Sequence, residues 1–126
     1  MREHRKDFDR LQHILAAIER IERYTSGKSY QDLVADDMMY YAVVKNIEII
    51  GEAANMLTPE FVDLHPETPW KMVRGMRNYI VHEYFQIDDE VVWDVVENNL
   101  SELKDQVSRY LKETDWNEWG QTNDKE

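Results

Sequence analysis

The chain contains no cysteine among its 126 residues, so it has no disulfide framework, no thiol nucleophile and no Cys-ligated zinc site. Four glycines and three prolines are too few for a loop-rich β-sandwich or a collagen-like repeat. No apolar run approaches the ~20 residues that a membrane-spanning helix needs. The first residues also lack the apolar stretch of a secretory signal, so we expect a cytoplasmic protein with no membrane partner.

The formal net charge of −11 is distributed unevenly along the chain. From residue 88 to the end there are 12 acidic and 4 basic residues. Residues 69–82, in contrast, contain Lys71, Arg74 and Arg77 and no acidic residue. The overall charge weakens non-specific attraction to nucleic acid, whereas the short basic segment offers a local site for phosphate.

Apolar residues recur at spacings of three and four, which predicts an all-α fold. We expect an up-down bundle of four main helices with one or two short helices. The main helices are expected over residues 8–25, 36–57, 69–80 and 88–111. The helical domain covers residues 1–114, and residues 115–126 form a polar tail that either frays or docks through its two tryptophans.

Helix starts are predicted from capping residues. Ser29 and Thr58 are expected to cap short helices that begin at Tyr30 and Pro59. By the same pattern, Thr68-Pro69 is expected to start the basic helix. Gly75 lies inside that helix, where glycine costs ~1 kcal/mol relative to alanine. We interpret it as a point where another backbone approaches closely.

The four histidines do not form a metal site in the sequence. His4, His13 and His65 are interpreted as surface or capping residues, since no His-x-x-x-His pair is present. We therefore predict no metal and no cofactor. Glu52, on the apolar central helix, is interpreted as a structural hydrogen-bonding or ion-pairing residue.

The segment around His82 combines groups that can cut RNA without a metal. Arg77 can stabilise charge on a phosphorane-like transition state, and His82 can transfer a proton near neutral pH. Asn78 and Tyr84 lie in the same segment. Arg77 and His82 are five residues apart, about 140° around a regular helix. Either the helix ends or distorts near His82, or two subunits combine their residues at one site.

An alternative is that these groups only form ion pairs with the many carboxylates. For Arg74, a salt bridge to Glu83 or Glu48 is weighed against a role as a contact to RNA phosphate, for which Lys71 is a second candidate. The spacing of these residues alone does not distinguish a role in ion pairs from a role in binding or cutting RNA.

The segment Arg77-Asn78-x-x-x-His82-x-Tyr84 resembles the R-x4-H-x-Y motif of the HepT-like branch of the HEPN superfamily. The central segment Ile49–Ala54, Pro69-Trp70 before the motif, and residues 88–93 after it also resemble the family pattern. The resemblance covers about residues 5–112.

The resemblance implies a homodimeric, metal-independent ribonuclease that acts as the toxin of a type II toxin–antitoxin pair. Arg77, His82 and Asn78 would be its catalytic residues, and cleavage would leave a 2′,3′-cyclic phosphate on an RNA substrate, with tRNA as one candidate. It also implies an MntA-like nucleotidyltransferase antitoxin that transfers AMP to Tyr84, and a higher assembly of dimer and antitoxin. AMP there would block RNA by bulk and charge.

A second hypothesis is a binding module. The domain would then be a non-catalytic HEPN partner, or substrate-binding subunit, of a minimal nucleotidyltransferase. Its acidic surface would serve protein contacts, and the motif would be an AMP-acceptor or nucleotide-binding surface. A purely structural dimer is a third possibility, but it gives no reason for Arg77, Asn78, His82 and Tyr84 to cluster.

Overall fold

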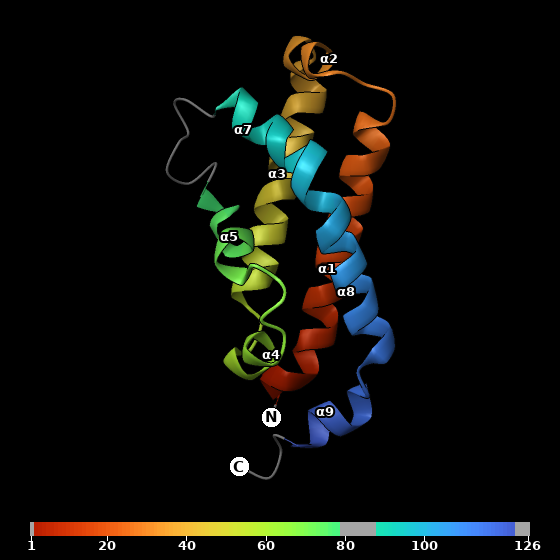
Figure 1. The fold of residues 1–126 in the computed structure, drawn as a ribbon, viewed down its shortest axis with the longest axis vertical. Helices are drawn as coiled ribbons and strands as arrows, with labels where there is room; N and C mark the ends of the chain where they lie inside the picture. The colour runs from red at the N-terminus through yellow and green to blue at the C-terminus, as the bar shows by residue number, and fades with distance from the viewer. Residues whose placement is uncertain (1, 79–87, 123–126) are drawn as a thin grey trace.

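A computed structural model describes residues 2–78 and 88–122, and in these ranges the chain consists of helices and turns with no strand (Figure 1). The predicted all-α fold is therefore confirmed. The elements are α1 (Arg2–Thr25), α2 (Tyr30–Ala35), α3 (Asp37–Asn55), α4 (Pro59–Leu64), α5 (Trp70–Gly75), α7 (Asp89–Asp94), the π-helical turn η1 (Val95–Asn99), α8 (Leu100–Glu113) and α9 (Trp116–Thr122).

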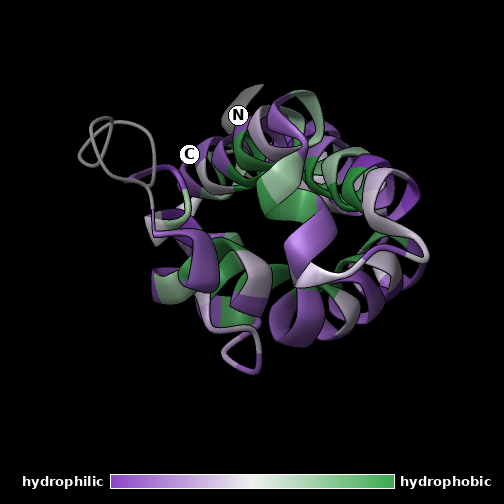
Figure 2. Ribbon diagram, turned by 90° about the horizontal axis from the view of Figure 1, so that it is seen from above, coloured by the Kyte–Doolittle hydropathy of each residue, from purple (hydrophilic) through white to green (hydrophobic). Residues whose placement is uncertain are grey.

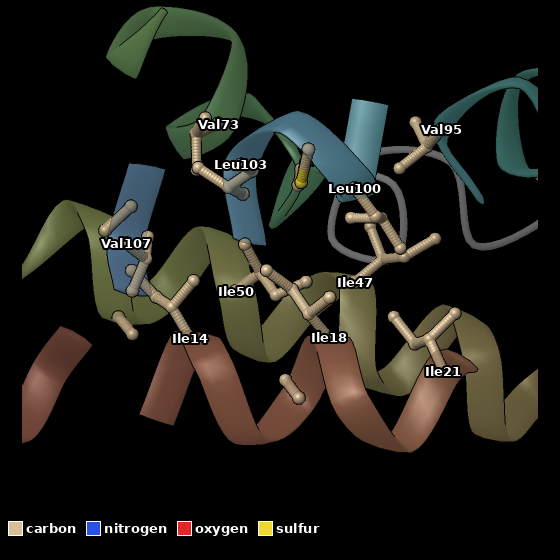
Figure 3. Packing of buried hydrophobic residues seen from close by; sticks show 14 of the residues in the cluster. Ile14, Ile18, Ile21, Ile47, Ile50, Val73, Val95, Leu100, Leu103 and Val107 are labelled. Atoms are coloured by element: carbon tan, nitrogen blue, oxygen red, sulfur yellow. The ribbon is translucent and has the colours of Figure 1, made fainter. Parts of the chain in front are cut away.

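Helices α1 and α3 pack along each other, α8 lies against α1, and α5 packs on α3 (Figure 1). The core lies between them, and the view from above shows the apolar residues of the ribbons turned inward (Figure 2). Isoleucines of α1 and α3 meet leucines of α8 and Val73 of α5 in this core (Figure 3). The core thus joins the helices that carry the basic segment to the rest of the bundle.

The predicted caps of the short helices are confirmed. The Ser29 hydroxyl accepts from the Asp32 amide at 3.1 Å, and the Asp32 carboxylate accepts from the Ser29 amide at 3.0 Å. Thr58 caps α4, which begins at Pro59. Asp36 caps α3 by accepting from the Met39 amide at 3.1 Å, so two short helices and one long helix begin where side-chain oxygens satisfy free amides.

Two expectations for the basic helix are wrong. Pro69 is its N-cap and Thr68 makes no cap bond, because the Thr68 hydroxyl is bound to side chains of α8 instead. The predicted regular helix through residue 80 is interrupted after Gly75, where the amides of Met76 and Arg77 bond three residues back rather than four, and Asn78 is helical again. Residues 79–87 lie outside the described part of the chain.

The C-terminal segment docks rather than frays over Trp116–Thr122. This segment forms α9 against the start of α1, where Trp116 packs edge-on to Phe8. Trp119 stacks near His4, with 4.6 Å between the ring centroids. His4 is 4% exposed, so its interpretation as a surface or capping residue is wrong, whereas His65 does end α4 as predicted.

Candidate functional site

The start of α5 is anchored to α8. Trp70 is buried, and its indole N–H donates to the His65 carbonyl at 2.9 Å. The Thr68 hydroxyl donates to the Gln106 side-chain carbonyl at 2.8 Å and also contacts the Tyr110 hydroxyl. These bonds fix the point from which the basic segment projects.

The same network shifts the pKa values of two of its members. Burial raises the pKa of Tyr110 to about 12. Its hydroxyl donates to the Glu67 carboxylate at 2.9 Å. The Glu67 backbone amide and this hydroxyl hold the pKa of Glu67 below its ordinary 4.5. Both shifts favour the protonation states that make the hydrogen bond at neutral pH.

The end of α5 is set by a close backbone contact with α3. A Cβ atom placed on Gly51 would lie 2.3 Å from the Arg77 backbone nitrogen and 3.0 Å from its Cα. Only glycine lets the two backbones come this close. At Gly75, for which the sequence suggested a close approach, a Cβ would meet nothing within 4 Å among the described residues. The close approach predicted for Gly75 is therefore found at Gly51 within the described chain.

This contact places Arg77 at an accessible edge of the bundle. One Arg77 terminal nitrogen lies 3.9 Å from a Glu52 carboxylate oxygen, and the two side chains are 40% and 53% exposed. At that distance the pair is weak and uses one terminal nitrogen, so among the described residues most guanidinium donors have no carboxylate partner. The interpretation of Glu52 as an ion-pairing residue agrees with this contact. Asn78 follows directly and is half-buried.

Lys71 and Arg74 precede Arg77 on the same segment. Neither makes an ion pair with a carboxylate of the described residues, and the buried Arg74 Nε has no hydrogen-bond acceptor there. The suggested Arg74–Glu48 salt bridge is not formed, and Glu48 instead accepts from Lys45 at 3.0 Å. The other suggested partner, Glu83, lies outside the described residues.

The structure thus brings together Lys71, Arg74, Arg77 and Asn78 of the predicted site. His82 and Tyr84 lie outside the described residues. In the part of the chain that is described, no three histidine or acidic side chains form a group that could hold a metal ion. No helix of that part is long and apolar enough to cross a membrane.

A hollow of about 260 Å³ adjoins this edge between α1 and α3. It is lined by Arg10, His13, Lys45, Glu48, Ile49, Glu52, Ala53 and Met56. Glu52 belongs both to this lining and to the Arg77 ion pair, so the hollow and the basic segment are continuous. The sequence analysis missed the hollow, and its only local signal was the spacing of Arg10 and His13 on the polar side of one helix.

A second hollow, of about 550 Å³, lies beside Tyr30 of α2 and Trp93 of α7. Three carboxylates, those of Glu90, Asp94 and Glu97, line it. Burial and the neighbouring acidic groups raise the pKa of Tyr30. This electrostatic environment repels phosphate, so the hollow between α1 and α3 is the better continuation of a site for an anion.

Comparison with known proteins identifies relatives along most of the chain. The family described as ribonuclease HepT-like matches residues 14–110. "Putative RNase TTE0752" from Caldanaerobacter subterraneus subsp. tengcongensis is 37% identical over 102 residues, which are 81% of this chain and 91% of that protein. "Probable ribonuclease HepT" from Thermococcus cleftensis is 36% identical over 112 residues, 89% of this chain and 100% of that protein.

A third relative carries an additional part. "Gamma-glutamylcyclotransferase and putative RNase MJ0434" from Methanocaldococcus jannaschii is 37% identical over 107 residues, which are 85% of this chain and 48% of that protein. No solved structure gives a significant match.

Proposed function

The chain belongs to the ribonuclease HepT-like family, and on that premise we propose that it is a metal-independent endoribonuclease. In the proposed reaction the ribose 2′-hydroxyl oxygen attacks the adjacent phosphorus. The bond from phosphorus to the 5′ oxygen then breaks. The products are a 2′,3′-cyclic phosphate and a 5′-hydroxyl. The nucleophile belongs to the RNA, so the reaction needs no nucleophile from the protein. The absence of cysteine from the chain is therefore compatible with this chemistry.

The observation that carries the proposal is that the Arg77 side chain is exposed and only weakly paired. Its guanidinium is 40% exposed and reaches one carboxylate oxygen at 3.9 Å, so an incoming phosphate can replace that contact with shorter, two-pronged bonds. Lys71 and Arg74 add two cations without ion-pair partners among the described residues. In a chain of net charge −11, this local excess of positive charge gives RNA a place to bind.

Within this proposal Arg77 stabilises the negative charge that develops on the phosphate oxygens. His82 takes the proton of the 2′-hydroxyl or gives a proton to the 5′ oxygen. Asn78 orients the phosphate by hydrogen bonding. Because α5 ends at Gly75, Arg77 and His82 do not have to share the face of one continuous regular helix.

We further propose that the enzyme is a homodimer formed through the exposed side of α3 near its N-terminal end. Met38 is 85% exposed and Tyr41 is 62% exposed, although both are large apolar residues. A dimer that covers these two residues would bury apolar surface. It would leave the edge with Glu52 and Arg77, near the other end of α3, open to RNA.

The proposed biological role is that of a toxin in a type II toxin–antitoxin pair. A cognate MntA-like nucleotidyltransferase would neutralise it in an assembly with the dimer. The Tyr84 phenolic oxygen would attack the α-phosphorus of ATP, forming the AMP ester and releasing pyrophosphate. The added phosphate would repel RNA at the basic segment.

The test is RNA cleavage by the purified full chain in EDTA, with total RNA and tRNA as substrates. Mass spectrometry first verifies that the protein carries no AMP. Wild type is compared with Arg77→Ala, His82→Ala and the control Arg23→Ala, an exposed arginine at the far end of α1. We expect wild type and Arg23→Ala to cut RNA with cyclic-phosphate ends. Arg77→Ala and His82→Ala should be slower by about 100-fold or more.

Cleavage that survives equally in Arg77→Ala and His82→Ala would contradict the proposed site. Absence of cleavage by AMP-free wild type would contradict the enzyme. It would favour the binding-module hypothesis, in which the domain only binds a nucleotidyltransferase.

A further inference from the structure

The hollow between α1 and α3 differs from the rest of the surface in the balance of its charges. Two of its carboxylates are already matched with cations, since Lys45 donates to Glu48 at 3.0 Å and Arg77 faces Glu52 at 3.9 Å. Arg10 lines the same hollow and has no carboxylate partner among the described residues. With Arg77 counted, the charged groups at this point are three cations and two carboxylates.

The burial of Arg10 strengthens this observation. Its Nε atom is buried and has no hydrogen-bond acceptor in the described part of the chain. A guanidinium that has lost water at Nε and gained no protein acceptor has lost part of its solvation. An anion in the hollow would restore some of the missing electrostatic stabilisation. Arg74, on the basic segment, also has a buried Nε without an acceptor among the residues that the structure describes.

The other cationic groups of the hollow are accessible. His13 is exposed, and the Lys45 side chain is 65% exposed. Lys45 can therefore reach toward a bound anion while it stays beside Glu48, whose side chain is only 16% exposed and would lose its cation if Lys45 turned away. Together with Arg10 these side chains provide donors on two walls of a space of about 260 Å³.

We infer that this hollow is a second phosphate-binding position, where Arg10, assisted by His13 and Lys45, holds the RNA backbone beside the phosphate at Arg77. The inference rests on the proposed ribonuclease function. Glu52 connects the two positions, because it lines the hollow and pairs loosely with Arg77. The RNA thus crosses α3 between the basic segment and α1. The residues in the hollow position the RNA and do not touch the reacting atoms.

The test is binding of a fluorescein-labelled 2′-O-methyl RNA oligonucleotide of 12 nucleotides, which lacks the 2′-hydroxyl and cannot be cut. Its Kd is measured over a series of salt concentrations for the full-length wild type, Arg10→Gln, Lys45→Gln and Arg23→Gln. Arg23 is the matched control, since it lies exposed on the same helix and loses the same charge. Thermal unfolding of each variant verifies the fold.

We expect Arg10→Gln to weaken binding about tenfold and to reduce the slope of log K against log salt by about 0.7, the value for one phosphate contact on a single strand. Lys45→Gln, on an exposed side chain, should weaken binding about threefold without loss of stability. Arg23→Gln should change the Kd less than twofold. If Arg10→Gln matches Arg23→Gln, the inference is overturned, whatever the result for Lys45→Gln.

Cleavage of unmodified RNA separates this inference from the proposed function. If wild type cuts RNA but Arg10→Gln binds the probe like Arg23→Gln, the second phosphate position is wrong and the ribonuclease proposal stands. If wild type neither cuts unmodified RNA nor binds the probe, both proposals are overturned.

Discussion

Two regions of the molecule differ in whether their polar side chains find hydrogen-bond partners inside the protein. Where α1 begins and α4 and α9 pack against it, buried Asp7 accepts from the Thr58 amide at 2.9 Å, the Thr58 hydroxyl at 2.7 Å and the Trp119 indole at 3.0 Å. At the edge formed by α3 and α5, the Arg77 side chain makes one ion pair within the described part of the chain, at 3.9 Å. The Nε atoms of Arg74 and Arg10 there have no acceptor among the described residues.

The difference separates structural polar groups from binding groups. The three donors around Asp7 gain an acceptor inside the protein, and that arrangement supports the packing of three helices, although Nδ1 of the neighbouring buried His4 has no partner among the described residues. At the Arg77 edge, donors are left for an acceptor that comes from outside. We therefore expect substitutions near Asp7 to change stability and substitutions near Arg77 to change RNA binding and cleavage.

Asp7→Ala is expected to have the largest effect on stability. It removes the acceptor of three donors, and Asp7 itself is 0% exposed. Leaving buried donors unpaired should lower the free energy of unfolding by about 3 kcal/mol, as measured by urea denaturation. A loss below ~1 kcal/mol would mean that the hydrogen bonds of Asp7 contribute little to the stability of the fold.

Gly51→Ala should have the next largest effect. This variant should change both the stability of the fold and the candidate site. The new Cβ would meet the Arg77 backbone at 2.3 Å, so α3 and the end of α5 must separate. We expect a loss of about 2 kcal/mol in unfolding free energy and loss of RNA cleavage.

Gly75→Ala is the matched control, since its Cβ meets nothing within 4 Å in the described chain. It should keep the fold and raise stability by up to about 1 kcal/mol. Equal behaviour of the two variants in calorimetry would contradict the role assigned to the Gly51 contact.

Arg74→Gln is expected to have a smaller effect, on binding alone. Loss of one phosphate contact should weaken RNA affinity about fivefold, or ~1 kcal/mol, and reduce the salt dependence. Lys71→Gln should act in the same direction. Because neither side chain has an ion-pair partner among the described residues, the melting temperature should stay nearly constant. A clear drop in melting temperature without weaker RNA binding would mean that these side chains stabilise the fold and do not bind RNA.

The smallest effect is expected in alkaline solution, through Tyr110 of the network that anchors α5. Its pKa is 10.0 when unfolded and about 12 in the folded protein. The neutral phenol is thus favoured by folding, and this contribution is present below pH 10 and lost as pH rises toward 12. At pH 11 the loss should be about 1 kcal/mol. Urea denaturation of wild type and Tyr110→Phe between pH 9 and 11 should show a shallower decline for the variant.

Much of the fold could be predicted from local sequence patterns. The spacing of apolar residues and the caps at Ser29, Asp36 and Thr58 depend on neighbours within one or two helical turns, so they are visible in the sequence. The end of α5 was not visible in this way. It depends on contact with Gly51, a residue of another helix. Thr68 was misread as a cap for the same reason, since its partners lie on α8.

The candidate site was predictable to the same extent. The basic cluster of Lys71, Arg74 and Arg77 lies in one short segment, and its lack of nearby acidic residues can be read directly. The loose pair of Arg77 with Glu52 and the hollow at Arg10 require α1, α3 and α5 to be packed together. Similarly, docking of the tail through its tryptophans was one of two expectations, but the partner of Trp119 could not be predicted because Asp7 is 112 residues away along the chain.

The most direct test measures RNA cleavage in EDTA and thermal unfolding on the same preparations of Arg77→Ala and Asp7→Ala. Arg77→Ala should keep the wild-type melting temperature and lose about 100-fold or more in cleavage. Asp7→Ala should unfold at lower temperature but still cut RNA when assayed well below its melting temperature. Full cleavage by a folded, AMP-free Arg77→Ala would contradict the account.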